Sequence, residues 1–288
     1  MTTSILTPER NNLSSLVEKH QILIGFVLIL ALTCPFMIWD ALAAHDILPF
    51  RLPIPVMLMQ AYMPTVAVVI VTGLTTGRAG IRALLSKLLI ARVGFEWYLF
   101  AIFGIAAICA AAILLGNQFG PLPAVPILAE DMPSNPIALF AMVAVTFLVR
   151  GILNGEELAW RGFALPKLQA KYNALVSSVI LSVTFVLFHL PLFFDPEMGM
   201  GSFASFAIRA VALTTLFTWL YNNTRGSVLL AYLMHAAFNT WTAVFSIQTS
   251  TNPFQDWMMT VVMVVLAAIV VITAGAKDLS RKTSRIQE

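Results

Sequence analysis

The sequence predicts an all-α, polytopic membrane helix bundle with about eight transmembrane helices, and three observations lead to this prediction. First, 59% of the 288 residues are hydrophobic and 11% are charged, with a mean hydropathy of +0.86, whereas soluble domains carry about 25% charged residues. Second, the apolar residues form continuous runs, not the alternating pattern of strands. Third, Lys and Arg are concentrated in every second loop.

Each apolar run is long enough to cross a bilayer, which takes about 20 residues of helix. We expect one integral membrane domain over residues 1–288. The expected spans are 21–43, 56–75, 97–115, 137–160, 174–193, 204–221, 227–247 and 256–275.

The distribution of positive charge predicts the topology, because cytoplasmic loops carry an excess of Lys and Arg. The loops that lack positive charge alternate with the basic ones, and Arg51 is the exception. We therefore expect both termini on the cytoplasmic side. The basic residues are Arg10, Lys19, Arg78, Arg82, Lys87, Arg92, Arg161, Lys167, Lys171, Arg225, Lys277, Arg281, Lys282 and Arg285.

A basic amphipathic segment occupies about 76–96, with Leu and Ile between its positive charges. This pattern predicts a cytoplasmic helix that lies on the anionic surface of the inner leaflet. The net charge of the chain is +3, but the basic residues form no stripe. We therefore expect a lipid bilayer as a partner and no nucleic acid.

Ionisable residues at bilayer depth are costly, and they usually pair with one another or line a cavity. Glu157 and Arg161 are four residues apart, so they share a helix face and can pair. Glu156 points about 100° away from Glu157 and is left to face another element. For Arg150 and Arg209 we expect structural pairing with a carbonyl or polar neighbour inside the bundle.

Two further spans carry polar groups that could meet Glu156. His235 and Asn239 lie four residues apart on one helix face, and His189 precedes Pro191 late in its span. Glu156 is expected near the cytoplasmic end of the run 137–160, whereas a straight helix puts His189 in the outer half. Pro191 or a late start of that span must reconcile these depths if the two side chains are to meet.

One carboxylate, two imidazoles and a carboxamide are the groups needed to activate a water and to stabilise an oxyanion. "EELAWR" fits Glu-Glu-x-x-x-Arg at Glu156, Glu157 and Arg161, "FVLFH" fits Phe-x-x-x-His at Phe185 and His189, and "HAAFN" fits His-x-x-x-Asn at His235 and Asn239. In order and spacing these motifs resemble the CPBP (CAAX protease and bacteriocin-processing, Abi) family, which includes the type II CAAX prenyl endopeptidases.

The resemblance implies an intramembrane endopeptidase with a catalytic core at about 137–247. It implies that Glu156, with His189, activates the water, that His235 and Asn239 hold the oxyanion, and that Glu157 and Arg161 support the site. The implied substrate is a membrane-associated peptide or protein, with or without a lipid, and the implied location is a prokaryotic plasma membrane. No substrate identity or oligomeric state follows from the sequence.

Metal dependence is left open. No HExxH signature for zinc is present, and assigning His235 and Asn239 to the oxyanion leaves few metal ligands, so a mechanism without metal or other cofactor is favoured. The alternative is a zinc-dependent peptidase, a metalloprotease with Glu156, His189 and His235 as ligands. Other functions are a non-catalytic immunity or scaffold protein of the same fold and a transporter, whose expected matched broken helices are not evident.

Overall fold

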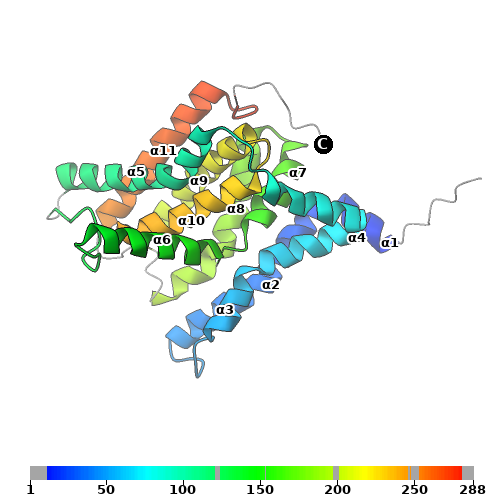
Figure 1. The fold of residues 1–288 in the computed structure, drawn as a ribbon. Coiled ribbons are helices and arrows are strands. Elements are labelled where there is room, and N and C mark those ends of the chain that lie inside the picture. Colours follow the sequence, from blue (N-terminus) through cyan, green and yellow to red (C-terminus); the bar gives the residue numbers. More distant parts are fainter. Residues whose placement is uncertain are drawn as a thin grey trace, which may run out of the picture.

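The computed structural model describes residues 12–120, 124–152, 154–196, 201–245, 247 and 253–280. Within these ranges the chain folds into helices without strands, as predicted (Figure 1). The basic residues Arg10, Arg281, Lys282 and Arg285 and the outer-loop residue Pro123 lie outside the described ranges. The elements are α1 (Asn12–Lys19), α2 (Gln21–Ala44), α3 (Ile54–Ala61), α4 (Met63–Ser86), η1 (Lys87–Leu89), α5 (Phe95–Phe119), α6 (Pro136–Ile152), η2 (Leu158–Ala164), α7 (Leu165–Gln169), α8 (Ala174–His189), η3 (Leu190–Phe194), α9 (Phe203–Asn223), α10 (Val228–Val244) and α11 (Pro253–Ala274).

Six helical segments in the described ranges are long and apolar enough to cross a membrane, so the chain is an integral membrane protein. They are Gln21–Ala44, Met63–Leu89, Phe95–Phe119, Ala174–Phe194, Phe203–Asn223 and Pro253–Ala274. The other two predicted spans correspond to the shorter apolar helices α6 and α10. The count of eight crossings remains a prediction.

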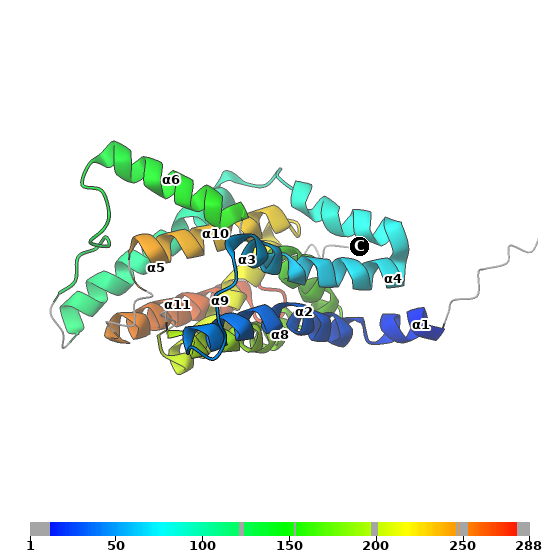
Figure 2. The ribbon, with the colours of Figure 1, turned by 90° about the horizontal axis from the view of Figure 1, so that it is seen from below.

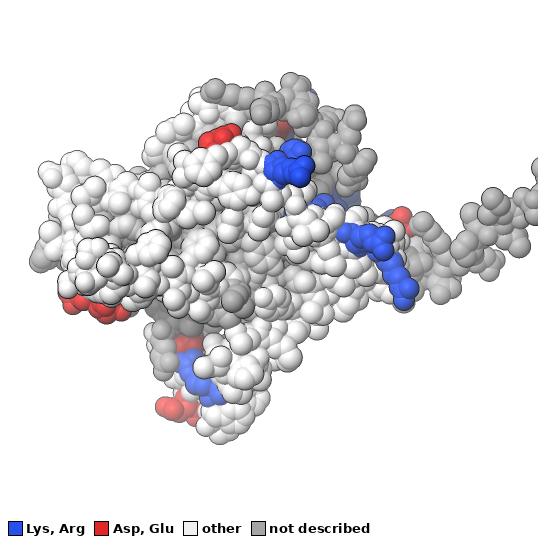
Figure 3. All heavy atoms as spheres, in the orientation of Figure 1, with Lys and Arg blue, Asp and Glu red and all other residues white. Residues whose placement is uncertain are grey.

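Hydrogen bonds between loops define two ends of the bundle. At the end that we call the basic end, Lys87 contacts η2, Ser227 donates to the Ile90 carbonyl, and the backbone N–H of Ala174 donates to the Lys277 carbonyl. At the opposite end, Arg51 pairs with Asp195 and the Ala129 N–H donates to the Val244 carbonyl. The loops therefore segregate as the alternation of positive charge predicts. Figure 3 shows the charged side chains near the ends of the molecule, with the middle of the surface free of charge.

Two hydrophobic clusters form the core. One consists of buried side chains from α5, α9, α10 and α11, and includes Leu216 and Met234. The other joins α2, α4 and α8 to η2, and includes Trp160 and Leu181. Because α10 also packs against α6 and η2, the segment that contains Glu156 lies between the two clusters.

The basic segment is a separate helix, bent away from the span that precedes it. Gly77 has φ 64° and ψ −157°, a left-handed backbone conformation that glycine adopts without a steric penalty. Figure 2 shows a sharp turn within the ribbon of α4. The helix then ends at Ser86 and a 3₁₀ turn follows, so the predicted segment 76–96 is helical over only its first part.

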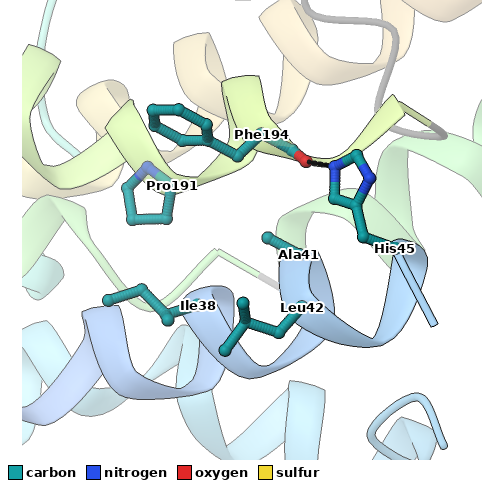
Figure 4. A pocket seen from close by; sticks show the side chains of 6 residues that line it. All are labelled: Ile38, Ala41, Leu42, His45, Pro191 and Phe194. Carbon is teal, nitrogen blue, oxygen red and sulfur yellow. Dashed lines mark hydrogen bonds between the residues drawn. The ribbon is translucent and has the colours of Figure 1, made fainter. Parts of the chain in front are cut away.

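A small apolar cavity of about 220 Å³ lies at the opposite end, between α2 and η3 (Figure 4). Its walls are Ile38, Ala41, Leu42, His45, Pro191 and Phe194. The His45 Nε2 lies 2.8 Å from the Phe194 carbonyl oxygen, and Arg51 pairs with Asp195 one residue later. The contacts of His45 and Arg51 thus hold the segment that follows His189 in position.

A reporter tag at residue 1 and one after residue 288 are both expected to be cytoplasmic, and a tag inserted near Pro123 is expected on the other side. The expectation follows from the segregation of basic loops at one end of the bundle. Protease protection in right-side-out and inverted vesicles measures all three positions. A C-terminal tag on the non-cytoplasmic side would overturn the eight-crossing topology.

Candidate active site

The chain breaks its helix immediately before the two glutamates. The predicted continuous run 137–160 is wrong in this respect, because α6 ends at Ile152 and residues 154–156 are not helical. The chain then forms a π-helix, η2, which continues into α7. π-Helices are rare and occur preferentially at functional sites. The break removes the geometric link between α6 and the glutamates, so their positions depend on contacts with other elements.

Gly155 lets the α3–α4 junction approach the break. A Cβ at this position would collide with the Ala61 carbonyl oxygen and would lie 2.6 Å from the Tyr62 Cα, so a side chain cannot fit. The Thr65 hydroxyl donates to the Gly155 carbonyl at 2.7 Å, and the Tyr232 hydroxyl of α10 is hydrogen-bonded to Thr65. The N-terminal half, which carries no recognisable motif, therefore positions the backbone beside Glu156.

Glu156 is partly buried, and only one of its two carboxylate oxygens accepts a hydrogen bond within the described residues; we call this carboxylate half-engaged. The Trp160 indole N–H donates to its Oε2 at 3.0 Å, and its own backbone N–H donates to the Asn154 Oδ1 at 3.3 Å. For Oε1 no hydrogen bond is formed within the described part of the chain. The sequence motif "EELAWR" contains Trp160 but gives it no predicted role, although its indole N–H is a suitable donor for a buried carboxylate.

Glu157 lies completely buried and joins η2 to α10. Both of its carboxylate oxygens accept from the Arg161 Nη1 at 3.0 Å, which is the ion pair that their spacing predicts. The His235 Nδ1 lies 2.7 Å from the Glu157 Oε1, a contact that the sequence did not predict. The Arg161 guanidinium also stacks 3.9 Å above the centre of the Phe217 ring. Glu157 therefore has a partner on its own helix and another on α10.

The His189 ring is held in one orientation by the other residue of its motif. Its Nδ1 lies 2.9 Å from the Phe185 carbonyl oxygen, so Nδ1–H is the donor and Nε2 is left with a free lone pair. The ring centre lies 4.1 Å from that of Phe185 and 5.5 Å from that of Phe206. The Nε2 is thus the only ring atom of His189 available to a bound water or substrate.

Glu156 and His189 influence each other electrostatically, although straight helices predict different depths for them. The chain reaches the basic end at the turn Ala170–Asn173; Glu156 precedes Ala170 by 14 residues, and His189 follows Asn173 by 16. The helix α8 begins at Ala174, where the predicted span 174–193 begins, so a late start of this span is not found. The charges of Glu156 and His235 both act on the His189 ring, so the side chains of the three motifs lie within electrostatic reach of one another.

Trp160 connects the first two motifs physically. Its ring packs edge-on against Phe185 and Phe188, with ring centres 6.1 and 5.6 Å away, while its N–H binds Glu156. Asn239 lies one turn after His235 on α10 and is partly exposed. Its amide has no hydrogen-bond partner in the ranges that the structure describes, so it is available to a ligand.

Two further arginines, Arg150 and Arg209, belong to predicted membrane spans, and the structure places them in different surroundings. Arg209 is buried and pairs with Asp256 of α11, with Ser205 and Thr260 completing the cluster, so its expected structural pairing is found. The expectation for Arg150 is wrong. It lies exposed in the last turn of α6 and has no ion pair within the described residues, because α6 ends two residues later and packs its other face on α10.

A metal ion would require several His, Cys, Asp or Glu side chains that converge on one point. In the part of the chain that the structure describes, no three His, Cys, Asp or Glu side chains converge closely enough to hold one ion. In each of His189 and His235, Nδ1 is bound to a protein acceptor and Nε2 is left open within the described residues. This is also the usual arrangement of a zinc-bound imidazole, so the hydrogen bonds of the two rings do not argue against a metal.

Reversing the charge of either Glu157 or Arg161 is expected to destabilise the protein, because it leaves an unpaired charge in a dry site; removing one partner of a buried pair costs about 3–5 kcal/mol. The Glu157→Arg/Arg161→Glu double variant should recover only part of this loss, since an arginine at position 157 would face His235. Thermal unfolding in detergent measures all three variants. Unchanged stability in the single variants would argue against the pair.

Comparison with known proteins gives two matches. Residues 136–241 match the family model described as type II CAAX prenyl endopeptidase Rce1-like. A protein named CAAX prenyl protease 2, from Methanococcus maripaludis, is 25% identical over 145 residues, which is 47% of this chain and 49% of that protein. The chain thus spans about half the length of this relative. The family match covers the three motifs and the elements α6 to α10 that carry them, and it confirms that the chain resembles the CPBP family of CAAX proteases.

Proposed function

We propose that the protein is an intramembrane endopeptidase of the CAAX protease type, which hydrolyses a peptide bond of a membrane-associated substrate with a water activated by Glu156. One observation supports this proposal. Three separate segments carry a half-engaged carboxylate, an imidazole with a free Nε2 and an uncommitted carboxamide, and the charges of Glu156 and His235 both act on the His189 ring. These are the groups required for water attack on a carbonyl.

Glu156 is the general base. Its Oε1 takes a proton from a water molecule. The free Nε2 of His189 accepts a hydrogen bond from the same water and so orients it. The water oxygen then attacks the peptide carbonyl carbon. The proton held by Glu156 then passes to the leaving amine as the C–N bond breaks, and the carboxylate is regenerated. Trp160 keeps Glu156 in place through the cycle, because its N–H holds the other carboxylate oxygen.

His235 and Asn239 stabilise the oxyanion. The Nδ1–H of His235 is used by Glu157, so His235 donates to the oxyanion from Nε2 in its protonated form. The adjacent Glu157 carboxylate favours this imidazolium electrostatically. The Asn239 amide is the second donor. Glu157 and Arg161 thus act through His235 and through the position of η2.

The substrate class follows from the setting and from the relative's name. The site lies among helices long and apolar enough to span a membrane, and the similar protein from Methanococcus maripaludis is named CAAX prenyl protease 2. We infer that the substrate is a peptide segment anchored in the bilayer, with a prenylated C-terminal peptide as the first candidate. A glutamate mechanism without metal or other cofactor is proposed over the zinc-dependent alternative, because no three His, Cys, Asp or Glu side chains of the described residues converge closely enough to hold one ion.

Glu156→Gln is expected to abolish cleavage of a farnesylated CAAX peptide by the purified protein while leaving peptide binding intact, because the amide keeps the shape and cannot accept the proton. Asn239→Ala should lower kcat roughly 10²–10³-fold, the usual effect of removing one oxyanion donor. The exposed Glu96→Gln is the matched control and should behave as wild type. If wild type does not cleave this peptide, comparing membrane proteomes of wild-type and Glu156→Ala strains identifies the native substrate. Full activity of Glu156→Gln on any verified substrate would refute the mechanism.

Purified active protein is expected to contain no stoichiometric zinc, and dialysis against a chelator should leave its turnover unchanged. Elemental analysis and peptide cleavage before and after dialysis measure both properties. If the protein contains zinc and loses activity when the zinc is removed, the metal-free mechanism is overturned. The peptidase assignment would remain in place. Absence of cleavage of every membrane peptide tested, with the fold intact, would instead favour a non-catalytic immunity or scaffold protein.

A further inference from the structure

The helix that follows the Gly77 bend presents an exposed face of mixed chemistry. Arg78 and Arg82 lie four residues apart and are both exposed. Leu85 and Leu89 follow along the same segment and are 42% and 82% exposed. This helix is the part of the apolar segment Met63–Leu89 that follows the Gly77 bend, and its mixture of arginines and leucines is typical of a helix at the level where lipid headgroups meet the acyl chains.

These side chains line a shallow, open groove along this one segment. The groove has a volume of about 490 Å³ and contains Arg78 and Arg82 together with the apolar Ile81, Leu85 and Leu89. It therefore combines two guanidinium groups with an apolar floor. A single ligand that is anionic at one end and hydrocarbon at the other matches both parts.

The two guanidinium groups have no acidic partner. Between Asp46 and Glu96 the sequence contains no Asp or Glu. Neither Arg78 nor Arg82 forms an ion pair or hydrogen bond with any residue that the structure describes. Figure 3 shows basic side chains at the end of the molecule where α1 and α4 lie. The positive charge of this surface is therefore available to an external anion.

We propose that this groove binds a phospholipid of the surrounding bilayer that carries an anionic headgroup. Arg78 and Arg82 hold the phosphate, which suits the planar, multiple-donor guanidinium group. One acyl chain lies along Ile81, Leu85 and Leu89. The lipid is a bilayer component and not a substrate, so the proposal stands whether or not the protein is a peptidase.

The opposite face of the same segment contacts the candidate active site. Leu84 is buried, and a Cβ added to Gly162 would lie 3.2 Å from its Cδ1. The Lys87 ammonium donates to the Gly162 carbonyl at 2.9 Å. Gly162 directly follows Arg161 in the π-helix. A lipid that fixes this segment on the bilayer therefore also restrains η2.

The experiment measures binding of spin-labelled phosphatidylglycerol and phosphatidylcholine to the purified protein in nanodiscs. We expect wild type to prefer phosphatidylglycerol by roughly 10–30-fold, since each arginine near an anionic headgroup contributes about a factor of five. Arg78→Gln/Arg82→Gln should reduce this preference to about that of the bulk bilayer. The matched control, Lys171→Gln/Lys277→Gln, removes two exposed charges elsewhere at the same end and should keep the preference.

Two further measurements define the site. The unfolding temperature of wild type should be higher in phosphatidylglycerol than in phosphatidylcholine, and this difference should vanish in Arg78→Gln/Arg82→Gln. Soluble glycerol 3-phosphate, which has the headgroup chemistry without acyl chains, should not compete with the labelled lipid at millimolar concentration. Equal binding of the two lipids to wild type, or equal loss of preference in the lysine control, would overturn the proposal. Neither result depends on peptide cleavage.

Discussion

The buried carboxylate of Glu157 is the interaction on which the arrangement of the site depends. It is fully buried, and it binds Arg161 on its own helix and His235 on α10. A lone carboxylate in such a place would be strongly unfavourable, and two partners with opposite or protonatable charge compensate for its burial. Since Arg161 also stacks on Phe217 of α9, this network connects η2, α9 and α10. The position of His235 follows from that network as much as from the packing of α10.

Glu156 is held in a different way from Glu157, and the difference suits a different role. Its contacts come from one indole N–H and from a backbone break that Gly155 and the α3–α4 junction define. No cation is bonded to it within the described residues, so its charge is not neutralised in the manner of Glu157. Two adjacent glutamates thus occupy contrasting environments, a fully paired one and a half-engaged one. In the proposed mechanism, this contrast separates a structural carboxylate, Glu157, from the one that exchanges a proton, Glu156.

Much of the architecture was predictable, because lipid imposes simple rules on sequence. Continuous apolar runs give the helices, and the loops segregate by charge as expected. The Glu157–Arg161 pair follows from helical spacing alone. The break at residues 154–156 has a local signal, the turn dipeptide Asn154–Gly155. Its exact position also depends on how closely Ala61 and Tyr62 approach Gly155, which the sequence does not show. The bond between His235 and Glu157 and the role of Trp160 depend on the packing of distant segments, which a single sequence does not encode in any local pattern.

The pairing of Arg209 with Asp256 bears on how the protein is made. Arg209 is in α9 and Asp256 is in the first turn of α11, 47 residues later. During synthesis α9 is therefore complete well before its counter-ion exists, and an arginine without a partner is costly at bilayer depth. A nascent chain that ends before residue 256 therefore carries an uncompensated cation in α9.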